Sequence, residues 1–476
     1  MAEMKDVVKD NPLGNAKVSR LIIKYAIPSI IAMLIVSFYN IVDQLFIGNV
    51  IGELGNAATN IAFPLTNVCV AFGLMFGIGG ASAFNLKLGA GDKERAPYYL
   101  GNAVSMLIIS GVVLIIIVEL FLEPILRAFG SPETVLPYAM DYTRIIAIGF
   151  PFAIFSAGAA HLLRADGRPN IAMVCNIIGG VINIGLDAWF VLGLGWGMAG
   201  AAWATIIGQI IAGLAGLWFI LHGKTFRLQL KHYIPQPKYF GKAASLGIAP
   251  MVNQISMMVV QILLNNSLKY YGGLSIYGEE IPIACAGIVS KVGSIFASVV
   301  IGLSQGNQPI VSFNYGAKNY ARVKEAYYRT MIIAFVASLV GFIVFQTIPD
   351  KILLLFGQGS DLYIEFGSLF FRRFYFFMCI FFIQMISSNF FTAIGKAWKG
   401  VFLSLTRQVL YLIPLMLIFP RFWGIDGILV AQPTADFFAI MTAVIMIAIE
   451  FRKPGFREAK GVFKSIFIKK QEPQQS

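Results

Sequence analysis

The sequence predicts an all-α integral membrane protein of about twelve transmembrane helices, built as two similar six-helix halves. Of its 476 residues, 57% are hydrophobic and only 13% are charged, and the mean hydropathy is +0.74. A soluble protein of this length has about a quarter of its residues charged. This composition therefore leaves too little charge to cover a soluble surface. Apolar stretches of spanning length and an internal repeat support the same fold class.

The apolar stretches have the length that a bilayer requires. Residues 103–122 and 197–221, for example, contain almost no charge. About 20 residues at 1.5 Å per residue cross a hydrocarbon core of about 30 Å, and lipid forces such segments to bond their own backbone groups as helices. The predicted helices cover residues 21–47, 57–86, 98–121, 135–162, 170–192, 198–222, 243–268, 282–313, 325–349, 362–390, 400–420 and 425–451.

The chain also repeats itself at a separation of 227 residues. Gly89-Ala90 with Arg95 recurs as Gly316-Ala317 with Arg322, each time after the second helix of a half. Four further matches occur in the same order: Phe129-Gly130 with Phe356-Gly357, Gly197 and Gly200 with Gly424 and Gly427, Gly167 with Gly395 one residue out of step, and Pro28 with Pro250 after a longer outer loop. Because six is even, the halves are parallel repeats, an arrangement typical of alternating-access carriers.

The formal net charge of +13 follows from topology and does not indicate nucleic-acid binding. Lys and Arg gather in the N-terminus, the even-numbered connections and the C-terminal tail, whereas the odd-numbered connections hold only Arg127, Lys269, Lys351 and Arg421. The positive-inside rule then places both termini in the cytoplasm. The predicted regions are an N-terminal segment (1–20), an N-lobe (21–222), a cytoplasmic linker (223–242), a C-lobe (243–451) and a basic tail (452–476) that rests against anionic lipid.

Several classes of site are not expected. The first 20 residues are polar and charged, so no cleavable signal peptide is predicted. The four cysteines have unrelated spacings and suggest neither a disulfide framework nor a zinc site. The glycine-rich run at 77–80 lacks the strand and the Lys-Ser/Thr of a phosphate-binding loop, and no His-Glu-x-x-His or nucleophile elbow is present. We therefore expect neither an enzyme nor a cofactor.

Ionisable residues inside the predicted helices mark a candidate site, because each costs about 2.5–3.5 kcal/mol in lipid. Asp43 lies on the first helix, and Asp187 lies on the fifth with Asn183 one turn earlier. Together with Thr205 on the sixth helix, they lie at one depth, roughly 8–10 Å below the outer surface.

Two interpretations of these four residues stay open. Carboxylate, amide and hydroxyl oxygens suit a small cation such as Na⁺, and two close carboxylates favour a shared proton. The alternative is that Asp43 faces the headgroups and Asp187 only hydrogen-bonds to Asn183.

Three motifs resemble those of the multidrug and toxic compound extrusion (MATE) antiporters, in the bacterial MepA-like branch. They are residues 39–43 (Tyr-Asn-Ile-Val-Asp) with Pro28 fifteen residues before the Asp, Gln308-Pro309 leading into residues 314–317, and residues 164–169 (Arg-Ala-Asp-Gly-Arg-Pro). The resemblance covers nearly the whole chain. It implies export of organic cations and other drugs in exchange for H⁺ or Na⁺, with Asp43, Asn183, Asp187 and Thr205 as the cation site.

The C-lobe departs from the pattern of those relatives that carry a second acidic site there. The seventh helix offers amides such as Gln254 and Gln261, and the middle of the tenth helix has no acid. Cation coupling in the C-lobe is therefore not expected, and Arg407 and Asp436 are interpreted as scaffolding. Tyr39, Asn40, Gln254 and Lys291 are candidate cavity residues, and Lys291 either contacts substrate or has a structural role.

Pro28 predicts a bend in the first helix, because proline removes a backbone hydrogen bond. We expect cation occupancy to shift this helix between straighter and more bent forms; the alternative is a static kink.

The implied location is the bacterial inner membrane, and we expect a monomer that binds drugs and lipid but no nucleic acid. Rival functions are a lipid-linked oligosaccharide flippase, a membrane enzyme and a channel. The flippase should carry several cavity cations, and only Lys291 and Arg407 could serve.

Overall fold

The computed structural model describes residues 11–129, 131, 133–355 and 360–459 except residue 52, and it describes no side chains between 43 and 57. Its elements are helices joined by short connections. In the first half they are α2 (Pro12–Asn15), α3 (Val18–Ile51), α4 (Glu53–Gly89), α5 (Ala96–Ala128), α6 (Leu136–Ile148), α7 (Phe150–Ala165), α8 (Pro169–Asp187), the π-helical η1 (Ala188–Gly193) and α9 (Gly197–Leu221).

The linker contains α10 (Leu230–Tyr233). The second half contains α11 (Pro237–Gly273), α12 (Glu280–Gly316), α13 (Tyr320–Thr347), α14 (Pro349–Leu355), α15 (Asp361–Phe374), α16 (Met378–Ala393), α17 (Ala397–Leu405), the π-helical η2 (Thr406–Leu412), α18 (Ile413–Trp423), α19 (Ile425–Phe451) and α20 (Pro454–Arg457).

The described helices confirm the predicted fold class. Ten are long and apolar enough to cross a membrane, and two bent pairs bring the number to twelve, which is six in each half. The predicted fourth and tenth helices are not straight: α6 and α7 meet at 55°, and α15 and α16 at 49°. Pro151 follows the first break and cannot donate a backbone hydrogen bond. The second break contains no proline.

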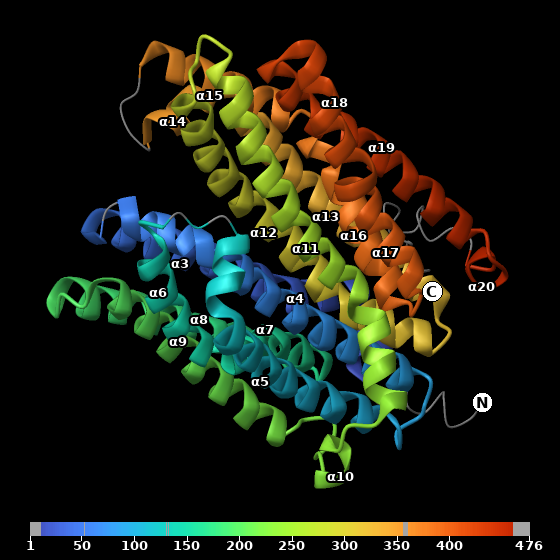
Figure 1. Ribbon diagram of the computed structural model, residues 1–476. Coiled ribbons are helices and arrows are strands. Elements are labelled where there is room, and N and C mark those ends of the chain that lie inside the picture. The colour runs from blue at the N-terminus through green and yellow to red at the C-terminus, as the bar shows by residue number, and fades with distance from the viewer. Residues whose placement is uncertain (1–10, 52, 130, 132, 356–359, 460–476) are drawn as a thin grey trace, which may run out of the picture.

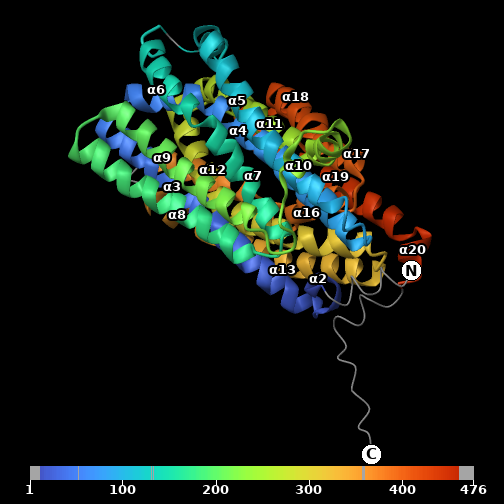
Figure 2. The same ribbon diagram turned by 90° about the horizontal axis from the view of Figure 1, so that it is seen from below.

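The two halves form two lobes, with α3–α9 in the N-lobe and α11–α19 in the C-lobe. Figure 1 shows the lobes meeting near α20 and diverging towards α6 and α15. Figure 2 shows α2 beside α13 at the end where the lobes meet. Arg322 of α13 donates to the carbonyl of Ala16 just after α2 (2.6 Å), and Lys324 donates to the carbonyl of Phe456 in α20 (2.6 Å). We call this end of the molecule the terminal end.

The lobes meet through contacts that the 227-residue repeat relates to one another. A Cβ on Gly89 would collide with the carbonyl oxygen of Phe313, and a Cβ on Gly316 would collide with the carbonyl oxygen of Leu86. Gly316 is the repeat partner of Gly89, and Phe313 is the repeat partner of Leu86. Each contact is therefore the image of the other across a pseudo-twofold axis, as expected for parallel repeats.

Hydrogen bonds between the lobes continue from the terminal end to the middle of the long helices. Gln308 of α12 donates to Ser82 of α4 (2.7 Å). Farther along, Ser37 of α3 bonds to Ser298 of α12 (2.7 Å). Gln254 of α11 donates to Asn67 of α4 at a similar level (2.8 Å). The predicted cavity residue Gln254 is therefore a link between the lobes.

The repeat also explains an unusual backbone position. Gly91 (φ 84°) and its repeat partner Lys318 (φ 58°) occupy the same left-handed turn position, and Lys318 is the one non-glycine residue with positive φ in the described chain. A side chain in the left-handed conformation costs roughly 1–2 kcal/mol. Glycine at position 318 would avoid this cost, but part of the gain in stability would be lost because glycine has more conformational freedom in the unfolded chain.

Lys318→Gly is therefore expected to stabilise the folded protein by about 0.5–1 kcal/mol. Thermal unfolding of the detergent-purified protein measures this effect. Lys318→Ala is the matched control, because it removes the charge but keeps the strained conformation. Equal melting temperatures for the two variants would contradict the explanation.

Candidate functional site

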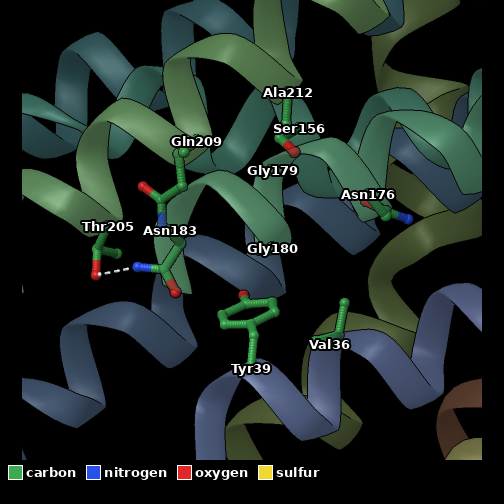
Figure 3. Close-up of a pocket in the computed structure, with 11 residues that line it drawn as sticks. Val36, Tyr39, Ser156, Asn176, Gly179, Gly180, Asn183, Thr205, Gln209 and Ala212 are labelled. Atoms are coloured by element: carbon green, nitrogen blue, oxygen red, sulfur yellow. Dashed lines mark hydrogen bonds between the residues drawn. The ribbon is translucent and has the colours of Figure 1, made fainter. Parts of the chain in front are cut away.

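A small open-sided cavity lies inside the N-lobe, between α3, α7, α8 and α9. Figure 3 shows the side chains that converge on it. The residues that line it are Val36, Tyr39, Ser156, Asn176, Gly179, Gly180, Asn183, Thr205, Gly208, Gln209 and Ala212. These residues include no Lys, Arg, Asp or Glu, so the described lining consists of amides, hydroxyls and apolar surface.

Glycines bring the helices of the cavity close together. A Cβ on Gly208 of α9 would lie 2.8 Å from the carbonyl oxygen of Gly179 on α8, which is closer than packed atoms approach. A Cβ on Gly180 would lie 3.2 Å from the ring of Tyr39 on α3. The missing side chains therefore let α9 and the Tyr39 ring approach α8.

Asn183 and Thr205 form the polar pair of this cavity. The Asn183 Nδ2 donates to the Thr205 Oγ1 at 3.3 Å, and only 3% of Asn183 is exposed. Its Oδ1 accepts no hydrogen bond from the described residues. A buried amide oxygen without a donor suits a cation or a water molecule.

The two predicted carboxylates lie on the helices that border the cavity. Asp187 is fully buried and is the last residue of α8, one turn after Asn183. Asp43 belongs to α3, four residues after Tyr39, but its side chain lies outside the described part of the chain. The structure thus brings Asn183, Thr205 and Tyr39 to one cavity and places Asp187 next to it on the same helix.

Three other predicted residues lie elsewhere. Pro28 is buried within α3, which continues as one helix through it. Asn40 is exposed on α3, and Lys291 is half-buried on α12. Lys291 lies two helical turns before Ser298 and hence on the α12 face that meets α3 through the Ser37–Ser298 bond.

Sequence reasoning missed three polar residues of the cavity. Gln209 follows Thr205 by one turn on α9, and Asn176 precedes Asn183 by two turns on α8. The helical period could have identified both. Ser156 lies on α7, and no spacing in the sequence connects it with this site.

Arg164, the first residue of the resemblance motif at 164–169, forms a polar contact between the lobes. It is 2% exposed on α7 and donates to Gln305 of α12 at 3.0 Å. The same guanidinium lies 3.0 Å from the Nδ1 of His161, a residue for which no role was predicted. Asp166 of this motif accepts backbone hydrogen bonds from Lys224 and Thr225 of the linker, both at 2.8 Å.

The chain consists of two six-helix repeats related by a pseudo-twofold axis, and one repeat contains a polar cavity. These features define a membrane transporter of the duplicated-lobe class. Comparison with protein families agrees: the MatE family matches residues 28–189 and 250–418, one segment in each lobe. The chain belongs to the MatE family. Members of this family are transporters and not enzymes.

Individual relatives match over most of their length. The chain is 27% identical to the multidrug export protein MepA of Staphylococcus haemolyticus over 334 residues, which are 70% of this chain and 71% of that protein. It is 22% identical to MepA of Staphylococcus aureus over 431 residues, 90% of this chain and 93% of that protein.

A solved multidrug resistance MATE family transporter in an outward-facing conformation has the same fold. It superposes with a TM-score of 0.85 at 22% identity, covering 95% of this chain and 98% of that chain.

Proposed function

We propose that this protein is a multidrug efflux antiporter of the bacterial inner membrane, which exports organic and often cationic compounds in exchange for H⁺ or Na⁺. The observation that carries the proposal is the N-lobe cavity, where the Asn183–Thr205 pair adjoins the buried Asp187. The family membership and the name of the MepA relatives support the same activity.

The coupling cation binds to oxygen atoms of the N-lobe. Asp187 supplies a carboxylate, Asn183 an amide oxygen and Thr205 a hydroxyl, all hard ligands that suit Na⁺, while either carboxylate can take a proton. Helical periodicity puts position 43 on the same face of α3 as Tyr39, which lines the cavity. Asp43 completes the site, and the cationic substrate competes with the ion for its negative charge.

The terminal end is the cytoplasmic end in this proposal, in agreement with the positive-inside distribution. The lobes are held together there by the Arg164–Gln305 and Gln308–Ser82 bonds and separate beyond the Ser37–Ser298 level. The described conformation is therefore outward-facing, and transport requires these contacts to break so that the lobes open towards the cytoplasm.

The flippase alternative is not favoured. A lipid-linked oligosaccharide carries anionic phosphates and requires several cations around its binding site. The described lining of the N-lobe cavity has none, and Arg407 is held in an ion pair with Asp436 (2.7 Å). This leaves Lys291 as the one predicted cavity cation without such a pair among the described residues.

Pro28 couples the ion site to lobe motion in this proposal. It lies between Ala26, which packs against Gly306, and Ile30, which packs against Gly302. These contacts hold the cytoplasmic part of α3 against the C-lobe. A bend at Pro28, where a backbone hydrogen bond is missing, therefore moves the outer part of α3 together with Asp43.

Pro28→Ala is expected to slow drug turnover several-fold while equilibrium binding of ethidium to the purified protein is retained. Alanine restores the backbone hydrogen bond and stiffens the helix. Initial efflux rates and ethidium binding, measured on the same preparation, check this prediction. Unchanged turnover would make Pro28 a static part of the scaffold.

The proposed function is tested with ethidium in inverted membrane vesicles under imposed gradients of H⁺ or Na⁺. One of the two gradients should drive ethidium accumulation, and the matching ionophore, nigericin for H⁺ or monensin for Na⁺, should abolish it. Ethidium movement that follows neither gradient would overturn the antiport proposal.

A further inference from the structure

The repeat allows the C-lobe to be compared with the N-lobe cavity, position by position. Gly197 (φ 55°), the first residue of α9, and Gly424 (φ 56°), which directly precedes α19, occupy equivalent positions. Counting from them, Thr205 corresponds to Gln432, and Gln209 corresponds to Asp436. The C-lobe thus has a carboxylate where the N-lobe cavity has the amide of Gln209.

The second helix of each site is aligned by another pair of turns. Gly167 (φ 82°) precedes α8, and Gly395 (φ 79°) precedes α17. Twelve residues after these turns lie Gly179 and Arg407. Gly179 lines the N-lobe cavity and leaves it open, whereas the equivalent position in the C-lobe carries the longest cationic side chain.

The side chains at these C-lobe positions contact each other. The Arg407 Nε donates to the Asp436 Oδ1 at 2.7 Å, and the Gln432 Nε2 lies 3.2 Å from both carboxylate oxygens. Only 15% of the Arg407 side chain and 8% of the Asp436 side chain are exposed. Arg407 is the second residue of η2, where the helix that starts as α17 becomes π-helical, and Asp436 lies on α19.

The acids of the N-lobe site have no acidic counterparts in the C-lobe. Asp43 follows Pro28 by fifteen residues, and the same step from Pro250 leads to Asn265. Asp187 follows Gly167 by twenty residues, and the same step from Gly395 leads to Leu415. The C-lobe counterpart of the cavity therefore contains one carboxylate paired with one guanidinium. The described lining of the N-lobe cavity has no charged residue, and its two candidate acids, Asp43 and Asp187, lie on the helices that border it.

We propose that Arg407 is the built-in cation of the C-lobe: its guanidinium pairs with Asp436 at the C-lobe counterpart of the N-lobe cavity, next to Gln432, which corresponds to the proposed ion ligand Thr205. A buried carboxylate needs a partner charge, and Asp436 receives a fixed one. Coupling is thereby confined to the N-lobe, and removing the guanidinium creates a second cation site at Asp436. The inference rests on the proposed function only in assigning cation coupling to the N-lobe. Whether Asp436 binds a cation is measured separately from transport.

Other charged groups near Asp436 do not replace this partner among the described residues. Tyr375, at the α15–α16 break, donates its hydroxyl to the carbonyl of Val289 on α12 (3.3 Å). Arg373 of α15 pairs with Asp426 at the outer end of α19 (2.7 Å), and Lys399 of α17 pairs with Glu450 at the opposite end (2.7 Å). The remaining charges on α11 and α18 lie near the ends of those helices.

The test counts bound cations on the purified full-length protein. Proton binding between pH 5 and pH 9 and binding of ²²Na⁺ are measured for wild type, Arg407→Gln, Asp436→Asn and the double variant Arg407→Gln/Asp436→Asn. Arg407→Gln should bind about one more H⁺ or Na⁺ per chain than the double variant. Wild type and Asp436→Asn should bind equal numbers.

Controls separate this effect from misfolding and from failure of the proposed function. Arg373→Gln breaks an exposed Arg–Asp pair whose acid, Asp426, lies on α19 like Asp436, and it should add no cation. Asp187→Asn reports on the N-lobe site independently of Asp436. If Arg407→Gln cannot be purified, a difference between wild type and Asp436→Asn already overturns the proposal, as does an Arg407→Gln count equal to that of the double variant.

Discussion

Asp187→Asn is expected to reduce ion-driven drug export to the level of cells without the transporter. The substitution keeps the size of the side chain and removes the charge from a fully buried position beside Asn183. Without that charge the site binds the coupling cation too weakly to drive export. Asp43→Asn should have the same effect, whereas Asn183→Ala should impair coupling less severely and Thr205→Ala should be milder still, because each removes one neutral ligand.

Ethidium efflux from cells, normalised to transporter abundance in isolated membranes, measures these effects. Asp141→Asn is the matched control, because Asp141 is an exposed carboxylate on α6, away from the cavity. Wild-type efflux by well-expressed Asp187→Asn and Asp43→Asn proteins would exclude the N-lobe as the coupling site.

The second large effect is expected at the crossing of α4 and α11. A Cβ on Gly79 would collide with the carbonyl oxygen of Ala243, and a Cβ on Gly247 would collide with that of Met75. Gly79→Val should therefore prevent the lobes from closing at the terminal end. Overpacking of this kind costs about 1–3 kcal/mol, so the described conformation should lose roughly tenfold to hundredfold in population, and transport should fall accordingly.

Spin labels on exposed positions of the two lobes, Tyr138 of α6 and Leu362 of α15, report the separation of the lobes at the other end of the molecule. Gly79→Val should shift this distance distribution to shorter values. Gly241→Val on α11 is the control, since a Cβ there meets no neighbouring atom within 4 Å. An unchanged distance distribution together with full transport would show that the close crossing of α4 and α11 is not needed for the lobes to meet at the terminal end.

The sequence predicted the twelve spans well, because lipid imposes length and apolar composition on every spanning helix. It did not predict the bends at Pro151 and at residues 375–377, since hydropathy reports burial in lipid and not helix direction. The sequence placed Asn183 and Thr205 at one depth, and they bond to each other in the structure. Their role as cation ligands stays a prediction.

Other features needed tertiary structure. Ser156 comes to the cavity from a helix whose sequence shows no polar pattern, and Gln254 contacts Asn67 of the other lobe. Arg407 and Asp436 were each interpreted as scaffolding, and the structure shows that they form an ion pair. Only the alignment of the glycine turns shows that this pair lies at the C-lobe counterpart of the cavity.

The most direct test of the central claim is cation displacement from the purified protein by a transported drug. Tetraphenylphosphonium, a lipophilic cation, should release bound H⁺ or ²²Na⁺ from wild type and from Asp141→Asn. It should release neither from Asp187→Asn. Equal release from wild type and from Asp187→Asn would contradict a coupling site in the N-lobe cavity.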